Sequence, residues 1–194
     1  AGLHRINISL DTLEEEKYKR ITGAPLLKEV LKGIDAAVEA ELSPIKINMV
    51  LLRNVNENEV ERMIEFVRKR RLILQLIELV NSPFSAKIFQ EFYADLSGIE
   101  KELEKKASKV WVRKEMQARR KYLIDGAEVE VVRPMHNSEF CAFCTRLRFT
   151  ADGRLKPCLM RDDNLVDVSK FLENIEGLRQ AFHEAISRRE PFFR

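Results

Sequence analysis

The order of strand-like and helix-like segments in the first part of the chain limits the fold more than any other feature. Residues 4–10, 45–52 and 72–79 are short, apolar-rich runs with the length of β-strands. Between them, apolar residues recur at helical spacing, first in a helix expected at 26–41 and then in a helix after Asn56. The apolar stripes of these helices are Leu27, Val30, Leu31, Ile34 and Val38, and Val60, Met63, Ile64 and Val67. This alternation predicts parallel βαβ units and the α/β fold class.

Helix starts in this region carry recognisable signals. Thr12 with Glu15, and Asn56 with Glu59, have the spacing of capping boxes, in which each side chain bonds the other residue's backbone N–H. Pro25 precedes the helix expected at 26–41. We therefore expect Thr12 and Asn56 to cap the helices that follow them.

The expected strands are polar on one face, which is unusual for a parallel sheet covered on both sides. One face carries Ile6, Ile8, Leu10, Ile47, Met49 and Leu51, and the other carries Arg5, Asn7, Ser9, Asp11, Lys46 and Asn48. A solvent-facing sheet would explain this pattern. A partial barrel whose polar interior holds a substrate explains it equally well, and the parallel topology favours the barrel.

The pattern changes after the third strand. The stretch "NSPFS" at 81–85 interrupts the alternation, and a charged helix is expected near 86–106. Asp125-Gly126 between alternating segments predicts a type I′ hairpin. An amphipathic helix is expected at 175–189. We expect one domain at 1–84 and a second, α+β domain at 85–194.

Composition excludes some classes of protein and favours a cytoplasmic one. The 194 residues are 45% hydrophobic and 34% charged, and their net charge of +3 is too mild to imply nucleic-acid binding by itself. The apolar runs are far too short for a membrane span, so no membrane partner is expected. Three cysteines, an odd number with two of them close together, fit a metal site in a reducing compartment better than a disulfide framework.

The three cysteines form a C-x2-C-x13-C pattern at Cys141, Cys144 and Cys158. A hairpin turn expected at 152–153 would return Cys158 toward Cys144. His136 could complete a Cys3His zinc site, which the spacing alone favours because such sites are common. The alternative is a cubic iron–sulfur cluster held by three cysteines, with one iron left open to a substrate.

Two arginines lie close to these cysteines. Arg146 and Arg148 alternate with Leu147 and Phe149, so we expect both guanidinium groups to point the same way. Together with Lys46 they could hold several phosphates, because arginine binds phosphate oxygens in a bidentate manner. The alternative is that they are solvated or paired with carboxylates.

Four segments in this order, "INISLD", "KINMVLLRNVNENEV", "LIEL" and "FCAFCTRLRFTADGRLKPCL", resemble the C-terminal part of the GTP 3',8-cyclase family of molybdenum cofactor biosynthesis. The resemblance runs from about residue 3 to residue 190, and the cysteine motif with its paired arginines is highly specific. It implies the C-terminal half of an incomplete TIM-type parallel β/α barrel at 1–84. It also implies a C-terminal α+β iron–sulfur domain at 85–194.

The family resembled here consists of radical S-adenosylmethionine enzymes with two 4Fe-4S clusters. The N-terminal cluster cleaves S-adenosylmethionine to a 5'-deoxyadenosyl radical, which abstracts hydrogen from the ribose C3' of GTP. The C3' radical then attacks guanine C8 to give (8S)-3',8-cyclo-7,8-dihydroguanosine 5'-triphosphate. The C-terminal cluster binds the guanine through its open iron, so in this reading the substrate itself takes the fourth ligand position.

The resemblance assigns roles to single residues. Cys141, Cys144 and Cys158 would hold the C-terminal cluster. The GTP site would include Lys46, Arg146, Leu147 and Arg148, and we add Asn48 because it faces the same way as Lys46. Ser9 resembles the serine that contacts S-adenosylmethionine. Val80 stands where the family usually has Met, so a backbone contact with S-adenosylmethionine would survive and a side-chain contact would not.

Two departures from the family pattern shape the expectations. The C-x3-C-x2-C motif of the radical cluster is absent, and the chain ends "PFFR" where family members often end in Gly-Gly. We therefore expect the chain to be a fragment of a longer protein, and we expect this fragment alone not to catalyse the reaction. The family tends to form homodimers, and an open strand edge near residues 1–12 favours self-association or loss of order there.

Two other interpretations remain open from the sequence. One is a zinc-stabilised module that binds nucleic acid through Arg70, Arg71, Arg119, Arg120 and Lys121. Its aromatic residues do not interleave with the basic ones as a stacking platform would, so a nucleic-acid partner is not expected. The other is a different radical enzyme with an auxiliary cluster. The paired arginines and Lys46 favour a triphosphate substrate instead.

Overall fold

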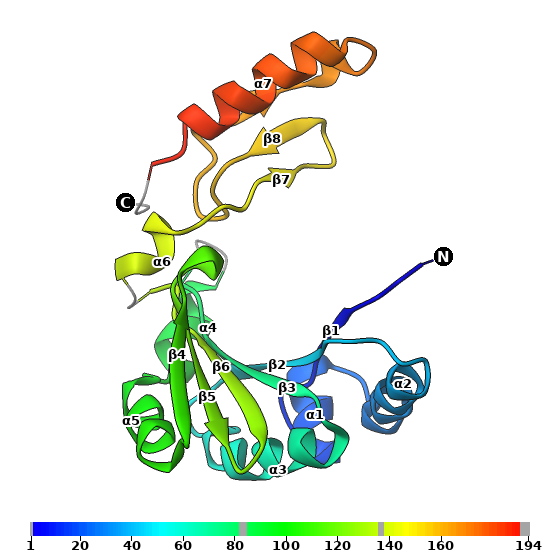
Figure 1. Cartoon of the computed structure of the whole chain (residues 1–194), viewed down its shortest axis with the longest axis vertical. Coiled ribbons are helices and arrows are strands. Elements are labelled where there is room, and N and C mark those ends of the chain that lie inside the picture. The colour runs from blue at the N-terminus through cyan, green and yellow to red at the C-terminus, as the bar shows by residue number, and fades with distance from the viewer. Residues whose placement is uncertain (1, 82–84, 136–137, 191–194) are drawn as a thin grey trace. The chain divides into compact units, whose positions relative to one another are not determined.

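A computed structural model describes residues 2–81, 85–135 and 138–190 of the chain (Figure 1). The chain divides into two compact units. Unit 1 comprises Ala1–Arg113 and Arg119–His136, and unit 2 comprises Lys114–Ala118 and Asn137–Arg194. His136, considered above as a metal ligand, lies outside the described residues, as does the middle of the "NSPFS" stretch.

The described strands of unit 1 form one six-stranded, mixed sheet in the order β1-β2-β3-β6-β5-β4. These strands are β1 (Ile6–Ser9), β2 (Ile45–Leu51), β3 (Ile73–Glu78), β4 (Lys109–Arg113), β5 (Arg119–Ile124) and β6 (Ala127–Val132). Strands β1, β2, β3 and β6 pair in parallel, and β5 and β4 add antiparallel. The predicted α/β class is confirmed, with a mostly parallel sheet.

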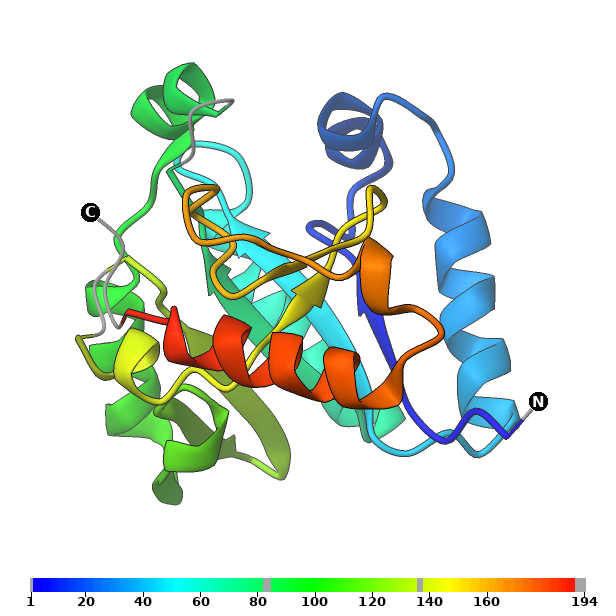
Figure 2. The ribbon, with the colours of Figure 1, turned by 90° about the horizontal axis from the view of Figure 1, so that it is seen from above.

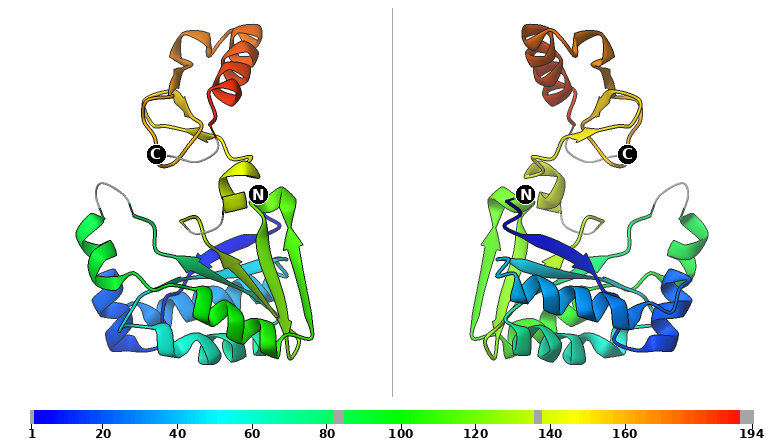
Figure 3. Two further views of the ribbon diagram at one scale, coloured as in Figure 1. Left: turned by 90° about the vertical axis from the view of Figure 1, so that its left-hand side faces the viewer. Right: turned by 90° about the vertical axis from the view of Figure 1, so that its right-hand side faces the viewer.

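Helices of unit 1 cover one side of this sheet, as Figure 3 shows. They are α1 (Glu15–Thr22), α2 (Leu27–Glu39), the 3-10 helix η1 (Glu57–Glu59), α3 (Val60–Arg70) and α5 (Ser97–Lys106). A further helix, α4 (Ala86–Phe92), has no buried residue and lies at one end of the sheet. In β2 the residues that face the helices are fully buried, whereas those between them remain partly accessible. The predicted polar face therefore exists, on the side of the sheet that these helices leave uncovered.

The prediction of one continuous helix near 86–106 is wrong, because the structure divides this stretch into two helices, α4 and α5. Tyr93 adopts an extended backbone after α4, and its hydroxyl donates to Glu78 Oε1 at 2.8 Å. Residue 93 also forms an isolated antiparallel bridge with Leu52. The interruption follows from contacts with residues far away in the sequence, which a local charge pattern does not encode.

Both predicted capping boxes are wrong. The Thr12 hydroxyl donates to Glu59 Oε1 at 2.8 Å, and α1 begins after Glu14 without a side-chain cap. Asn56 accepts from the Leu52 N–H and donates to two backbone carbonyls, so it braces the end of β2 instead of capping a helix. The side chains are used for tertiary contacts between β1, β2 and the start of α3.

Glu59 provides a stability test. Its buried carboxylate accepts from Thr12, from the Leu13 N–H at 3.0 Å and from Lys17 at 3.0 Å. Burial by itself raises the pKa of Glu59, but the Leu13 and Lys17 hydrogen bonds outweigh it and lower the pKa below 4.5. This stabilisation is complete above the ordinary pKa and is lost as pH falls through the lowered one. We expect Glu59→Gln to lower the free energy of unfolding by about 2 kcal/mol at pH 7.

Urea unfolding of the wild type and of Glu59→Gln at pH 7 and pH 3 checks this prediction. The difference in free energy of unfolding between the two proteins should shrink at the acidic pH, because the stability that comes from the lowered pKa of Glu59 is lost as pH falls below the ordinary carboxyl pKa. Glu29→Gln is a matched control, since Glu29 is exposed on α2 and pairs with the exposed Lys32. If Glu59→Gln lowered the free energy of unfolding equally at both pH values, the stabilising role of the ionised Glu59 carboxylate would be contradicted.

Unit 2 is a small α+β unit built around the cysteine segment. It contains η2 (Lys114–Met116), α6 (Ser138–Ala142), β7 (Arg148–Phe149), β8 (Arg154–Lys156), β9 (Val166–Asp167), η3 (Ser169–Phe171) and α7 (Ile175–Ser187). Strands β7, β8 and β9 form an antiparallel sheet, and α7 lies beside it (Figure 2). Leu155, Val166, Val168, Ala181 and Ala185 form its core. The predicted tail helix is confirmed, and it ends at Ser187.

Two predicted hairpins are confirmed. Asp125 and Gly126 both have positive φ, 48° and 86°, as a type I′ turn requires. Gly153 has φ 81° and lies between β7 and β8. The first hairpin joins β5 and β6 to the sheet of β1–β3, and unit 1 ends at residue 136. None of the helices in the described part of the chain has the length and apolarity needed to span a lipid bilayer.

Candidate functional site

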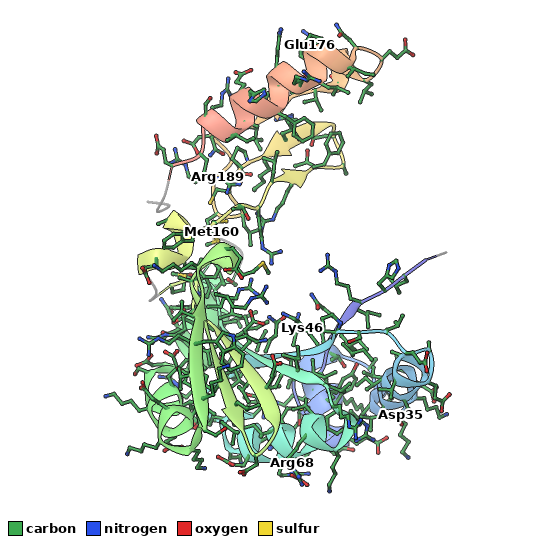
Figure 4. All side chains as sticks on the ribbon, viewed as in Figure 1. Asp35, Lys46, Arg68, Met160, Glu176 and Arg189 are labelled. Atoms are coloured by element: carbon green, nitrogen blue, oxygen red, sulfur yellow. The ribbon has the colours of Figure 1, made fainter. Side chains whose placement is uncertain are left out.

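The polar face of the unit 1 sheet presents one continuous row of side chains. Strand register aligns one residue from each strand across all six strands. The row consists of Ser9, Asn48, Gln75, Glu130, Lys121 and Trp111. Lys46 lies two residues before Asn48 and shares its face. Figure 4 shows Lys46 on the opposite side of the sheet from Asp35 and Arg68, which belong to α2 and α3.

Glu130 is the centre of the contacts on this face. Its Oε2 accepts from Lys46 Nζ at 2.7 Å and from Gln75 Nε2 at 2.9 Å, and its Oε1 lies 3.5 Å from Arg119 Nη1. Burial by itself raises the pKa of Glu130, but the Lys46 hydrogen bond and the charges of Lys46, Arg119 and Lys121 lower it overall. The carboxylate therefore stays ionised at neutral pH.

Asn48 has an unused acceptor. Its Oδ1 is buried and has no hydrogen-bond partner among the described residues. A buried acceptor without a donor is costly, so this position favours a ligand that brings an N–H or O–H group. Lys46 is partly buried beside it and keeps donors for a second partner.

The two residues assigned to S-adenosylmethionine lie at strand ends. Ser9 is the last residue of β1 and is exposed. Val80 follows β3, is half-buried, and its carbonyl oxygen accepts from Ser85 Oγ at 3.1 Å. Both positions are at the carboxyl ends of parallel strands, where ligands bind in open α/β sheets.

The cysteine segment lies in unit 2. Cys141 is in α6, Cys144 follows it, and Cys158 comes after β8; all three are free and half-buried. Within the described residues no three His, Cys, Asp or Glu side chains are gathered around a possible metal position. The donor set still suits an iron–sulfur cluster or zinc, because both prefer thiolates. The ligand set stays a prediction.

Two side chains hold the chain around Cys144. Gln117 Nε2 donates to Cys144 Sγ at 3.5 Å. The Arg189 guanidinium donates to the carbonyl oxygens of Cys144 and Arg146, which ties the segment after α7 to the cysteine segment (Figure 4). Sequence reasoning missed both residues, since neither belongs to a local motif.

The arginine pair is only partly arranged as expected. Strand β7 begins at Arg148, so strand alternation does not orient Arg146, which is exposed. Leu147 packs against the core of unit 2. Over the described residues neither Arg146 nor Arg148 forms an ion pair with a carboxylate. The two cations thus remain available to an anionic ligand.

Comparison with known proteins identifies the family. The model of the Molybdenum Cofactor Synthesis C family matches residues 72–194. The chain belongs to this family. Residues 1–67 match the Radical SAM superfamily, so the matches together cover almost the entire chain. The resemblance found in the sequence motifs is confirmed.

Relatives of this chain carry a more specific name. Proteins named probable GTP 3',8-cyclase are 52% identical in Methanosarcina mazei and 54% identical in Methanosarcina acetivorans, each over 100% of this chain and 58% of the relative. That of Methanothermobacter marburgensis is 50% identical over 100% of this chain and 64% of its own length. The chain thus spans about three fifths of these relatives.

Sequence reasoning found part of the polar face of this family member. It identified Ser9, Lys46 and Asn48, missed Glu130 and Gln75, and considered Arg119 only as a nucleic-acid contact. The segment "AEVEVV" does alternate, which places Glu128 and Glu130 on one face of β6. That signal was overlooked because the hairpin was assigned to a separate domain and not to the sheet of β1–β3.

Proposed function

We propose that this chain is the C-terminal portion of a GTP 3',8-cyclase. In this proposal it contributes part of an incomplete radical SAM barrel and the second 4Fe-4S cluster to the conversion of GTP to the cyclised nucleotide. The observation that carries the proposal is about 50% identity over the entire chain with proteins named probable GTP 3',8-cyclase. The polar face of the sheet supports it, since a substrate needs such a lined surface.

GTP binding is assigned to the polar face and to the arginine pair. Lys46 would donate to phosphate oxygens, and the unpaired Asn48 Oδ1 would accept from an N–H or O–H of the nucleotide. Arg146 and Arg148, which have no carboxylate partner within the described residues, would bind phosphate, with Leu147 between them supported by the core of unit 2.

The cluster is assigned to Cys141, Cys144 and Cys158. When bound, a 4Fe-4S cluster with three protein ligands supplies an open iron that can coordinate the guanine. Gln117 would donate to the Cys144 sulfur, a contact of the kind that tunes cluster potentials. Arg189 would hold the backbone of Cys144 and Arg146, and so position a cluster ligand and a GTP ligand together.

S-adenosylmethionine would contact Ser9 and the region of Val80, whose backbone can substitute for the usual Met at this position. The sequence contains no C-x3-C-x2-C motif for the radical cluster. This chain alone should therefore form no 5'-deoxyadenosine from S-adenosylmethionine. A homodimer in the cytoplasm remains the proposed state of the whole enzyme.

The nucleic-acid alternative loses support from the placement of the basic residues. Arg119 and Lys121 are buried on the polar face, where they contact Glu130 and Glu128. Arg70 pairs with Asp35 at 2.9 Å. Three of the five basic side chains of that alternative are therefore paired with carboxylates, so they do not form an open basic surface of the kind that binds a phosphate backbone.

Equilibrium binding of GTP to the whole chain tests the proposal. Lys46→Met is expected to weaken GTP binding about tenfold or more, because it removes a charge-assisted hydrogen bond. Lys28→Met is the matched control. Lys28 is 77% exposed on α2, so its replacement should leave GTP affinity unchanged. Equal affinity of Lys46→Met and wild type, with both proteins folded, would contradict the assignment.

A further inference from the structure

We propose that Glu130 is a positioning residue that holds Lys46 over the centre of the polar face for binding the GTP polyphosphate. The inference rests on the proposed function of Lys46 in GTP binding. The alternation of β6 places Glu130 on the polar face but gives it no role. The assignment comes from its contacts and its burial in the structure.

The burial of Glu130 limits what it can do. Its side chain is 0% exposed, whereas that of Lys46 is 12% exposed. The carboxylate oxygens already face Lys46, Gln75 and Arg119, and their negative charge would repel phosphate. Glu130 therefore acts through the cations and the amide that donate to it.

The geometry explains why Lys46 needs such an anchor. Lys46 is on β2 and Glu130 is on β6, with β3 between them in the sheet. Neighbouring strands lie about 4.8 Å apart, so the two backbones are separated by about 10 Å. The Lys46 side chain must lean over β3 to reach the carboxylate, and the 2.7 Å contact fixes its ammonium above the middle of the sheet.

The same contact leaves Lys46 able to bind a ligand. An ammonium has three donors, and Glu130 Oε2 accepts one of them. The second donor to Oε2 is Gln75 at 2.9 Å, and Oε1 faces Arg119. The carboxylate thus fixes three donors of the face at once, and it compensates the mutual repulsion of Lys46 and Arg119.

A double-mutant cycle on the whole chain tests the proposal, with GTP affinity as the readout. We expect Glu130→Gln to weaken GTP binding about tenfold, because Lys46 loses its anionic acceptor while the side-chain volume is kept. In a Lys46→Met background the same change should have less than about a twofold effect. Glu128→Gln is the matched control, since Glu128 is on the same face of β6 but pairs with Lys121.

A second measurement separates positioning from a general loss of structure. The ammonium signal of Lys46 in nitrogen-15 NMR should be protected from solvent exchange in the wild type and lose protection in Glu130→Gln. Glu130→Asp keeps the charge, and it should recover part of both the protection and the affinity. An unchanged Lys46 signal in Glu130→Gln would overturn the proposal.

The outcomes distinguish this inference from the proposed function. Equal losses of GTP affinity from Glu130→Gln with and without Lys46 would overturn the positioning role and leave the function of Lys46 intact. Full GTP affinity in Lys46→Met would instead overturn the GTP assignment of the polar face, and with it this inference. Weak binding in both single variants, without further loss in the double variant, supports the proposal.

Discussion

Replacing Cys144 by serine is expected to reduce the iron content of the reconstituted chain from about four atoms to nearly none. A cluster held by three thiolates has no spare protein ligand, and a serine oxygen is a poor substitute for a soft sulfur donor. Cys144 is also the cysteine whose sulfur receives the Gln117 hydrogen bond. Anaerobic reconstitution followed by iron and sulfide analysis measures the effect.

Thr145→Ala is the matched control for this experiment. Residue 145 is exposed next to Cys144, so its replacement should leave iron binding unchanged. Zinc analysis of the same samples is needed, because thiolates bind zinc well. Retention of full iron content by Cys144→Ser would show that Cys144 is not a ligand of the cluster.

The double variant Arg146→Lys with Arg148→Lys is expected to weaken GTP binding about a hundredfold, or about tenfold for each substitution. Lysine keeps the charge but loses the planar fork that binds two phosphate oxygens together. Neither arginine has a competing carboxylate partner within the described residues. Equilibrium binding of GTP at constant salt measures the effect.

Arg154→Lys controls for a general change of charge geometry in the same hairpin. Arg154 begins β8 and pairs with Asp152 at 3.0 Å, so it already has a carboxylate partner. Its replacement should leave GTP affinity unchanged. Equal affinity of the Arg146/Arg148 double variant and the wild type would remove both arginines from the GTP site.

Local patterns predicted much of the fold. The apolar periodicity of α2 and α3 and the alternation of β2 locate these elements, because burial against one face repeats with the period of the element. The Asp125-Gly126 turn was predictable for a different reason. Only a few residue types accept positive φ at both positions of such a turn.

Contacts between distant residues could not be predicted in this way. Glu59 bonds Thr12 across 47 positions of the chain, which converts an apparent capping box into a tertiary contact. Lys46 and Glu130 are separated by 84 positions, and no sequence pattern relates them. The sequence therefore indicated some of the side chains on the polar face but not which of them bind each other.

The proposed substrate-binding cluster is tested most directly by the electronic and magnetic spectrum of the anaerobically reconstituted chain before and after addition of GTP. We expect about four irons and four sulfides per chain, with a signal that shifts when GTP binds. One tightly held zinc per chain, with no response to GTP, would contradict the proposal that these cysteines hold a substrate-binding cluster.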